Sequence, residues 1–204
     1  MKWEEITVKK YYDILEILKE DIGDPLELNS RLIDCIWDID SADIPILRFS
    51  WYLDELAFLQ KPYEPKLPKK EYTVAGKTFK PILDVSKITT AQYIDFQELV
   101  KRSDHKLLLN VLFIEDGKEY GEVDNSDLLW ENLTLDAYSD VMYFFQRLLL
   151  DLMKDTLNSS KKILKKMYRK EKDPQKKEEM MDQMVKIHLA LLELNENGLA
   201  EWVQ

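Results

Sequence analysis

The two histidines and the single cysteine are the side chains of this sequence with the most obvious chemistry. His105 and His188 are far apart in the chain, and neither has a Cys or His neighbour at the spacing of metal ligands. We therefore expect no metal site at either histidine. Cys35 is followed by Ile36 and Trp37 on an apolar stretch. This setting predicts a buried, unreactive thiol, because a reactive cysteine needs accessible, electropositive surroundings.

Two clusters of acidic residues are the next candidates for a cation site. Asp38, Asp40 and Asp43 resemble the opening of a calcium loop. An EF-hand requires glycine at its sixth position and glutamate at its twelfth, where this chain has Asp43 and Phe49. We interpret these aspartates as turn and cap residues. We interpret a second cluster as a solvated loop, although its carboxylates are of the type that binds a cation weakly: Glu115, Asp116, Glu119, Glu122 and Asp124.

The motifs that mark common enzymes are missing from the sequence. There is no G-x-S-x-G nucleophile motif. The segment 75–78 ends like a phosphate-binding loop, but it lacks the earlier glycine and is more simply a hairpin turn. From the residues alone we therefore expect no catalytic site, no metal and no cofactor, and a function that depends on protein binding.

The composition predicts a helical protein of a reducing compartment. Only 5 of the 204 residues are glycine, which favours helices over sheets. One cysteine cannot form an internal disulfide, and the charged residues 1–5 do not resemble a signal peptide, so we expect a cytoplasmic protein. We expect no membrane segment, because the longest apolar runs, such as 107–114, are far shorter than the roughly 20 residues that span a bilayer.

The charge is distributed unevenly along the chain. Residues 161–177 contain nine Lys or Arg and two acidic residues, a net charge of +7, so that the remainder of the chain carries −17. Such an acidic body argues against general nucleic-acid binding, which depends on neutralising phosphates. The basic segment is of the type that contacts nucleic acid or an acidic partner, but it is more simply explained as a solvated helix face.

Apolar periodicity divides the chain into four parts. We predict a mainly α-helical fold with a multi-helix globular body, one small β-hairpin at about 71–80 and a long C-terminal helical arm. Helices are expected to begin after Thr7, at Pro25 and at Ile46, and again near Thr89 and after Asp173, while 105–114 favours helix over strand. We expect an N-terminal helical part at 1–60 and a proline-rich linker at 61–70. A hairpin with a helical middle at 71–157 and a basic then amphipathic arm at 158–204 should follow.

The long helix that begins near Thr134 leads to the strongest candidate for a binding surface. We expect a bend or stop at 158–160, because a helix that ran on without a break from Thr134 would be long for a compact domain. Beyond this point the apolar stripe is narrow and flanked by charge, so the arm needs a partner, which is either its own body or another chain. Flexible methionines suit adaptable apolar grooves, although they also fill ordinary cores. The candidate partner-binding residues are Ile163, Leu164, Met167, Met180, Met181, Met184 and Ile187.

The order of several motifs resembles a known family. The chain opens with residues 3–12, Trp-Glu-Glu-Ile-Thr-Val-Lys-Lys-Tyr-Tyr, and continues with Asp-Ile-Pro-Ile at 43–46 and Glu-Leu-Ala-Phe-Leu at 55–59. A hairpin then leads to Ile-Thr-Thr-Ala-Gln-Tyr-Ile-Asp-Phe-Gln at 88–97. Over about residues 3–155, this order is similar to small acidic helical proteins of tailed bacteriophages that are assigned as tail assembly chaperones. The basic arm lies outside the resemblance.

This resemblance implies a partner of the tape measure protein. Such chaperones cover the long helical tape measure and recruit tail-tube subunits around it, and the family has no active site and no cofactor. In that family a longer form often arises by ribosomal frameshifting. Two other functions remain open: a structural virion component, such as a head–tail connector or minor tail protein, and an unrecognised enzyme or regulator of a host factor.

Overall fold

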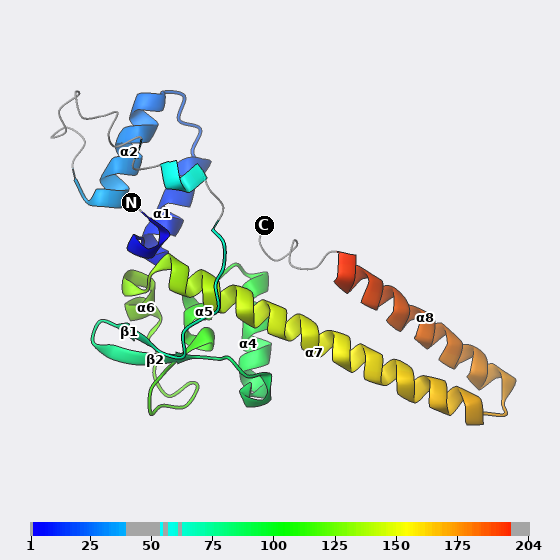
Figure 1. The fold of residues 1–204 in the computed structure, drawn as a ribbon. Coiled ribbons are helices and arrows are strands. Elements are labelled where there is room, and N and C mark those ends of the chain that lie inside the picture. Colours follow the sequence, from blue (N-terminus) through cyan, green and yellow to red (C-terminus); the bar gives the residue numbers. More distant parts are fainter. Residues whose placement is uncertain (1, 40–53, 55–56, 61–62, 197–204) are drawn as a thin grey trace. The chain divides into compact units, whose positions relative to one another are not determined.

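The computed structural model describes residues 2–39, 54, 57–60 and 63–196 (Figure 1). The chain divides into two compact units: residues 1–83 and 87–143 form the first, and residues 84–86 and 144–204 the second. Most of the helix predicted at 46–59 lies outside the described residues, as do Asp40 and Asp43. The prediction of a mainly helical chain with a small antiparallel sheet and a long C-terminal helix is confirmed.

The first unit begins with two antiparallel helices, α1 (Val8–Lys19) and α2 (Pro25–Trp37). Thr7 caps α1 by accepting a hydrogen bond from the backbone N–H of Lys10 at 3.3 Å. Asp24 caps α2 in the same way, and Pro25 occupies the first helical position, where its missing N–H costs nothing. The two helices enclose a cluster of buried apolar side chains, formed by Ile6, Ile14, Leu32 and Ile36.

The predicted hairpin is present and gains a third strand. Strands β1 (Tyr72–Val74) and β2 (Lys77–Pro81) pair in antiparallel fashion. Ala75 and Gly76 form the turn with φ angles of 47° and 80°. Both angles are positive, as the favoured two-residue hairpin turns require. The third strand, β3 (Phe113–Glu115), pairs antiparallel with β2.

Three further helices complete the core of the first unit. They are α4 (Thr90–Lys101), α5 (His105–Leu112) and α6 (Ser126–Asn132). Thr89 and Gln92 form a capping box at the start of α4, which confirms the predicted start near Thr89. The helical preference over 105–114 is confirmed as far as Leu112, after which the chain extends into β3.

A single helix, α7 (Leu135–Lys170), extends for 36 residues and crosses the division between the two units. The bend expected at 158–160 is therefore wrong. Asn and Ser each cost only about 0.5 kcal/mol in a helix interior relative to alanine, and packing against a neighbouring helix outweighs that cost. The neighbour is α8 (Pro174–Glu196), which returns antiparallel to α7 after a connection of three residues (Figure 1). None of the described helices combines the length and the apolarity needed to cross a membrane.

Candidate protein-binding surface

The side chains with the most obvious chemistry in the first unit have structural roles. Cys35 is half-buried and packs against the apolar cluster between α1 and α2, where burial raises the pKa of its thiol. A thiol with a raised pKa is a poor nucleophile at neutral pH. Asp38 ends α2 and forms an ion pair with Lys10 at 2.7 Å. These contacts agree with the interpretation of Cys35 as unreactive and of Asp38 as a cap residue.

His105 belongs to an aromatic stack contributed by three helices of the first unit. Tyr12 of α1 stacks on the His105 ring of α5 at 4.7 Å and on the Trp130 ring of α6 at 5.2 Å. The Nδ1 atom of His105 lies 2.9 Å from the hydroxyl oxygen of Tyr138. Burial is the main reason that the pKa of His105 is lowered and that the pKa of Tyr12 is raised. The stack therefore joins α1, α5, α6 and the start of α7 around a neutral imidazole.

The acidic cluster at 115–124 is engaged mainly in ion pairs and caps. Glu115 accepts a hydrogen bond from Lys77 at 2.9 Å, and Asp116 accepts one from Lys80 at 2.5 Å. Asp124 accepts hydrogen bonds from the backbone N–H of Ser126 and the amide of Asn110, which lowers its pKa to about 2. Within the part of the chain that the structure describes, no group of three or more His, Cys, Asp or Glu residues is placed to hold a metal ion.

The candidate binding surface lies instead on the helical hairpin of the second unit, formed by α8 and the part of α7 that follows Tyr143. From Lys154 onward, half-buried side chains of α7 recur at spacings of three and four residues, which is the pattern of a coiled-coil seam, and Ser160 is a further half-buried side chain on the flank of this seam. The seam positions of α7 are Lys154, Leu157, Lys161, Leu164 and Tyr168. Those of α8 follow the same pattern and are Lys177, Met180, Met184, Ile187 and Leu191.

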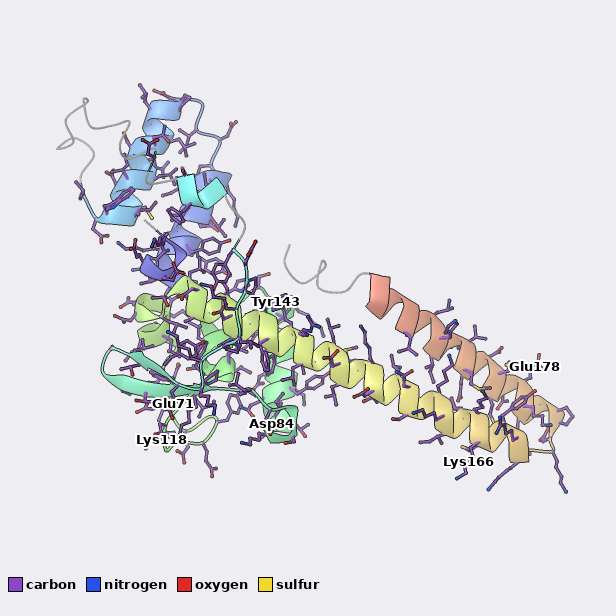
Figure 2. All side chains as sticks on the ribbon, in the orientation of Figure 1. Glu71, Asp84, Lys118, Tyr143, Lys166 and Glu178 are labelled. Carbon is purple, nitrogen blue, oxygen red and sulfur yellow. The ribbon has the colours of Figure 1, made fainter. Side chains whose placement is uncertain are left out.

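Two contacts fix how the helices of this hairpin face each other. The Nζ atom of Lys161 lies 3.3 Å from Nδ1 of His188, and the Nζ atom of Lys177 lies 5.5 Å from the centre of the Tyr168 ring. Lys166 on α7 and Glu178 on α8 mark the two helices near their connection (Figure 2). The seam is polar for a coiled coil, because Lys154, Lys161 and Lys177 occupy positions that are usually apolar.

The hairpin has almost no interior of its own. Among its described side chains, those from 150 to 191 are half-buried or exposed, and none is buried. Large apolar side chains remain exposed on each helix, with exposed fractions between 40% for Met153 and 59% for Ile163. A pair of helices in water gains most of its stability from burying an apolar face. The exposed apolar side chains therefore identify surfaces that further helices are able to cover.

These exposed side chains form two stripes. The α7 stripe consists of the exposed Met153, Ile163 and Met167, together with the exposed Thr156 and the half-buried Ser160 at the same helical spacing, and the exposed Leu152 lies on its outer flank. The α8 stripe consists of Met181, Val185 and Leu189. Relative to its own seam, the α7 stripe occupies the g and c positions of the heptad, whereas Met181 and Val185 occupy e and b and Leu189 occupies the outward-facing position f. In an antiparallel pair g flanks g and e flanks e, so Met181 and Val185 lie on the side of the hairpin opposite the α7 stripe, and Leu189 continues from them onto the outer face of α8.

The α8 stripe has charged neighbours that belong to α7. Beside the α8 stripe, at the e and b positions of α7, lie Lys162, Lys165 and Arg169 towards the connection, and Asp151 and Asp155 further away from it. The side chains of all five residues are exposed. A helix lying on the α8 stripe would thus meet cations near the connection, which favours a partner with acidic residues flanking its apolar side.

The predicted partner-binding residues separate into two groups. Ile163, Met167 and Met181 are exposed on the stripes. The other four, Leu164, Met180, Met184 and Ile187, are half-buried in the seam, where they hold the two helices together. Val185 and Leu189 were not among the predicted residues. The signal for them in the sequence is their spacing, because Met181, Val185 and Leu189 follow one another at intervals of four residues. This pattern can be recognised only after the seam positions have been assigned.

Comparisons with protein families, with characterised proteins and with solved structures give no match for this chain.

Proposed function

We propose that this chain is a non-enzymatic tail assembly chaperone of a tailed bacteriophage, and that its α8 stripe binds an amphipathic helix of the tape measure protein. The observation that carries the proposal is the exposed apolar side chains of Met181, Val185 and Leu189 on a hairpin with no buried described side chain between 150 and 191. An amphipathic helix that lies in an apolar groove is a common mode of peptide recognition.

The methionine content of α8 suits a chaperone. Met180 and Met184 support the stripe from the seam, and Met181 lies on it. Methionine side chains are unbranched and polarisable, so they adapt to apolar partners of varied shape. A protein that must cover many successive helical segments of one long partner gains from a surface of this kind.

The charge of the chain also supports a holding role. Outside the basic segment 161–177 the chain carries a net charge of −17. A large net charge keeps a protein soluble and opposes association of like-charged complexes. The cations at Lys162, Lys165 and Arg169 beside the α8 stripe would in turn attract acidic residues on a bound helix. Tail-tube subunits, the other partner implied by the resemblance, would be recruited to this complex in the cytoplasm of the host cell.

The test is a tagged pull-down from cells that are assembling the particle. Wild-type chain should recover the tape measure protein, and Met181→Lys should lose it, because a lysine there puts an unpaired charge into the apolar contact. Gln183→Lys is the matched control, since Gln183 is exposed on α8 but lies on the other side of the hairpin. If both variants recover as much tape measure protein as the wild type, the α8 stripe is not the binding surface.

Mass spectrometry of purified particles separates this function from its rivals. A chaperone leaves the particle, so the chain should be absent from mature virions. Its presence at a fixed stoichiometry would make it a structural component, such as a connector or minor tail protein. If the tape measure protein is not recovered and the chain is absent from particles, a regulator of a host factor or an unrecognised enzyme becomes the better explanation.

A further inference from the structure

We propose that the α7 stripe binds a second copy of this chain, with the two α7 helices antiparallel and crossing at Ser160. This surface is on the opposite side of the hairpin from the α8 stripe. The inference therefore goes beyond the proposed function and does not depend on the identity of the partner.

The α7 stripe has the same spacing on both sides of Ser160. Met153, Thr156, Ser160, Ile163 and Met167 follow one another at spacings of three, four, three and four residues. Met153 and Met167 are each seven residues from Ser160. A two-fold interface needs one patch that is complementary to itself, because the same residues line both halves. Antiparallel packing about Ser160 places Met153 against Met167 of the second copy, and Thr156 against Ile163 of the second copy.

The residues at the crossing point are small and uncharged. Ser159 and Ser160 have small side chains, which allow two helices to approach closely. The Thr156 hydroxyl donates to the carbonyl oxygen of Leu152 at 2.8 Å, so it brings no unpaired donor to the contact. Between Leu152 and Ile163 the residues at the stripe and its outer flank carry no charge. On α7 itself, a contact surface without charged side chains is therefore available over about three helical turns.

The charges along α7 favour an antiparallel orientation of the two helices. Residues 161–170 contain six Lys or Arg and no acidic residue, a net charge of +6. Parallel packing would place this segment against the same segment of the second copy, and like charges would oppose it. Antiparallel packing places it instead against residues 150–159, whose only basic residue is Lys154, so the repulsion between like charges is avoided; Asp151 and Asp155 of this segment lie on the side of α7 that faces away from the stripe. The charge distribution and the symmetry of the stripe therefore both favour antiparallel packing of the two α7 helices.

In the resulting dimer, each hairpin would be covered on its α7 side by the hairpin of the second copy. Two hairpins packed through α7 make a four-helix arrangement, in which Ile163 and Met167 become part of an interior. The α8 stripes of both copies remain on the outer sides. Each dimer would therefore present two identical binding surfaces that face away from each other.

The experiment is sedimentation velocity on the full chain over a wide range of concentrations. Wild-type chain should move from monomer to dimer as its concentration rises. Ile163→Lys should raise the dimer dissociation constant by about tenfold or more, since it places a charge at the centre of the contact. Val185→Lys, on the opposite side, should leave the constant unchanged, and circular dichroism should show equal helix content in all three proteins.

A second variant tests the crossing point without weakening the contact. Ser160→Cys, made together with Cys35→Ser, should form an intermolecular disulfide under mild oxidation, because the two-fold axis brings position 160 of both copies together. Asp155→Cys with the same Cys35→Ser change should not, because Asp155 faces away from the stripe. A chain that stays monomeric at every concentration, or a dimer that is broken by Val185→Lys but not by Ile163→Lys, overturns the inference. Recovery of the tape measure protein by Ile163→Lys separates this outcome from failure of the proposed function.

Discussion

The Nδ1 atom of His105 and the hydroxyl oxygen of Tyr138 lie 2.9 Å apart and join the first turn of α5 to the first turn of α7. Tyr138 is 5% exposed, and Tyr12 covers the other side of the arrangement by stacking on the imidazole. The apolar surroundings disfavour a positive charge on the imidazole of His105, whereas the nearby carboxylate of Asp104 favours it. Burial outweighs that attraction and lowers the pKa of His105.

This relationship predicts a loss of stability in mild acid. The unfolded chain takes up a proton at His105 near the ordinary pKa of 6.5, whereas the folded chain takes it up only at lower pH. The unfolded state therefore binds more protons in this window, and the free energy of unfolding should fall as pH decreases below about 6.5. Urea denaturation at a series of pH values should show a smaller decrease for His105→Gln than for the wild type. His188→Gln, which changes an exposed histidine of the hairpin, should keep the wild-type decrease; an equal decrease in all three proteins would exclude His105 as the source.

A second prediction concerns the carboxylate that holds the proline-rich segment in place. Asp140 is 8% exposed, and its Oδ1 atom accepts hydrogen bonds from the Tyr63 hydroxyl at 2.7 Å and from the backbone N–H of Lys66 at 2.6 Å. Asp140→Ala removes the acceptor of both bonds and should lower the free energy of unfolding by about 2–3 kcal/mol. Trypsin should then cleave faster after Lys66 and Lys69.

The matched comparisons use Asp140→Asn and Asp151→Ala. Asp140→Asn keeps an acceptor oxygen and should have a smaller effect. Asp151→Ala removes an exposed carboxylate of the same helix and should have little effect on cleavage. Equal cleavage rates for Asp140→Ala and the wild type would show that these two bonds do not hold the segment.

The third prediction compares two exposed glycines with different backbone conformations. Gly76 has a φ of +80°, which L-residues rarely adopt, while Gly23 has no such angle, and a Cβ atom added there would have no heavy atom within 4 Å. Gly76→Ala should destabilise the protein by about 1–2 kcal/mol through strain in the hairpin turn. Gly23→Ala should stabilise it by up to about 1 kcal/mol, because it restricts the unfolded chain. Urea midpoints that shift in the same direction for both variants would contradict this account.

The fourth prediction is that the chain remains folded when it is shortened to residues 1–157. The last buried side chain described along α7 is Leu149, so the truncation removes no described buried residue. The shortened chain should be soluble and should unfold cooperatively, with a midpoint close to that of the full chain. Aggregation or loss of a cooperative transition would place the arm in the core.

Local signals predicted the individual elements better than the contacts between them. The hairpin at 71–80 follows from the turn residues Ala75 and Gly76, and the starts of α1 and α2 follow from the caps at Thr7 and Asp24. The preference for helix over strand at 105–114 does not include strand β3, because this strand has only three residues and exists through its pairing with β2, about thirty residues earlier in the chain. Pairing between distant segments leaves no periodic pattern in a strand this short.

The same limit applies to the candidate site. The bend expected at 158–160 was inferred from the intrinsic preferences of Asn and Ser, which the packing of Leu157 and Leu164 in the seam overrides. The aromatic stack of Tyr12, His105 and Trp130 combines three helices that are distant in sequence, and no spacing in the sequence indicates it. The predicted partner-binding residues include both seam and stripe residues, because the prediction treats each helix as having one apolar face. In the structure each helix has two apolar faces, the seam and the exposed stripe.

Because no described side chain between 150 and 191 is buried, the hairpin should tolerate more substitutions than the first unit. A buried residue such as Phe79 or Phe113 is constrained in volume, since even one added or lost methylene is felt in a close-packed core. At half-exposed heptad positions the main requirement is an apolar side chain at the right spacing, so Leu, Ile and Met, which have similar volumes, can replace one another at low cost. The hairpin should therefore diverge quickly among descendants of one ancestor and follow changes in its partners, while the first unit retains the record of common descent.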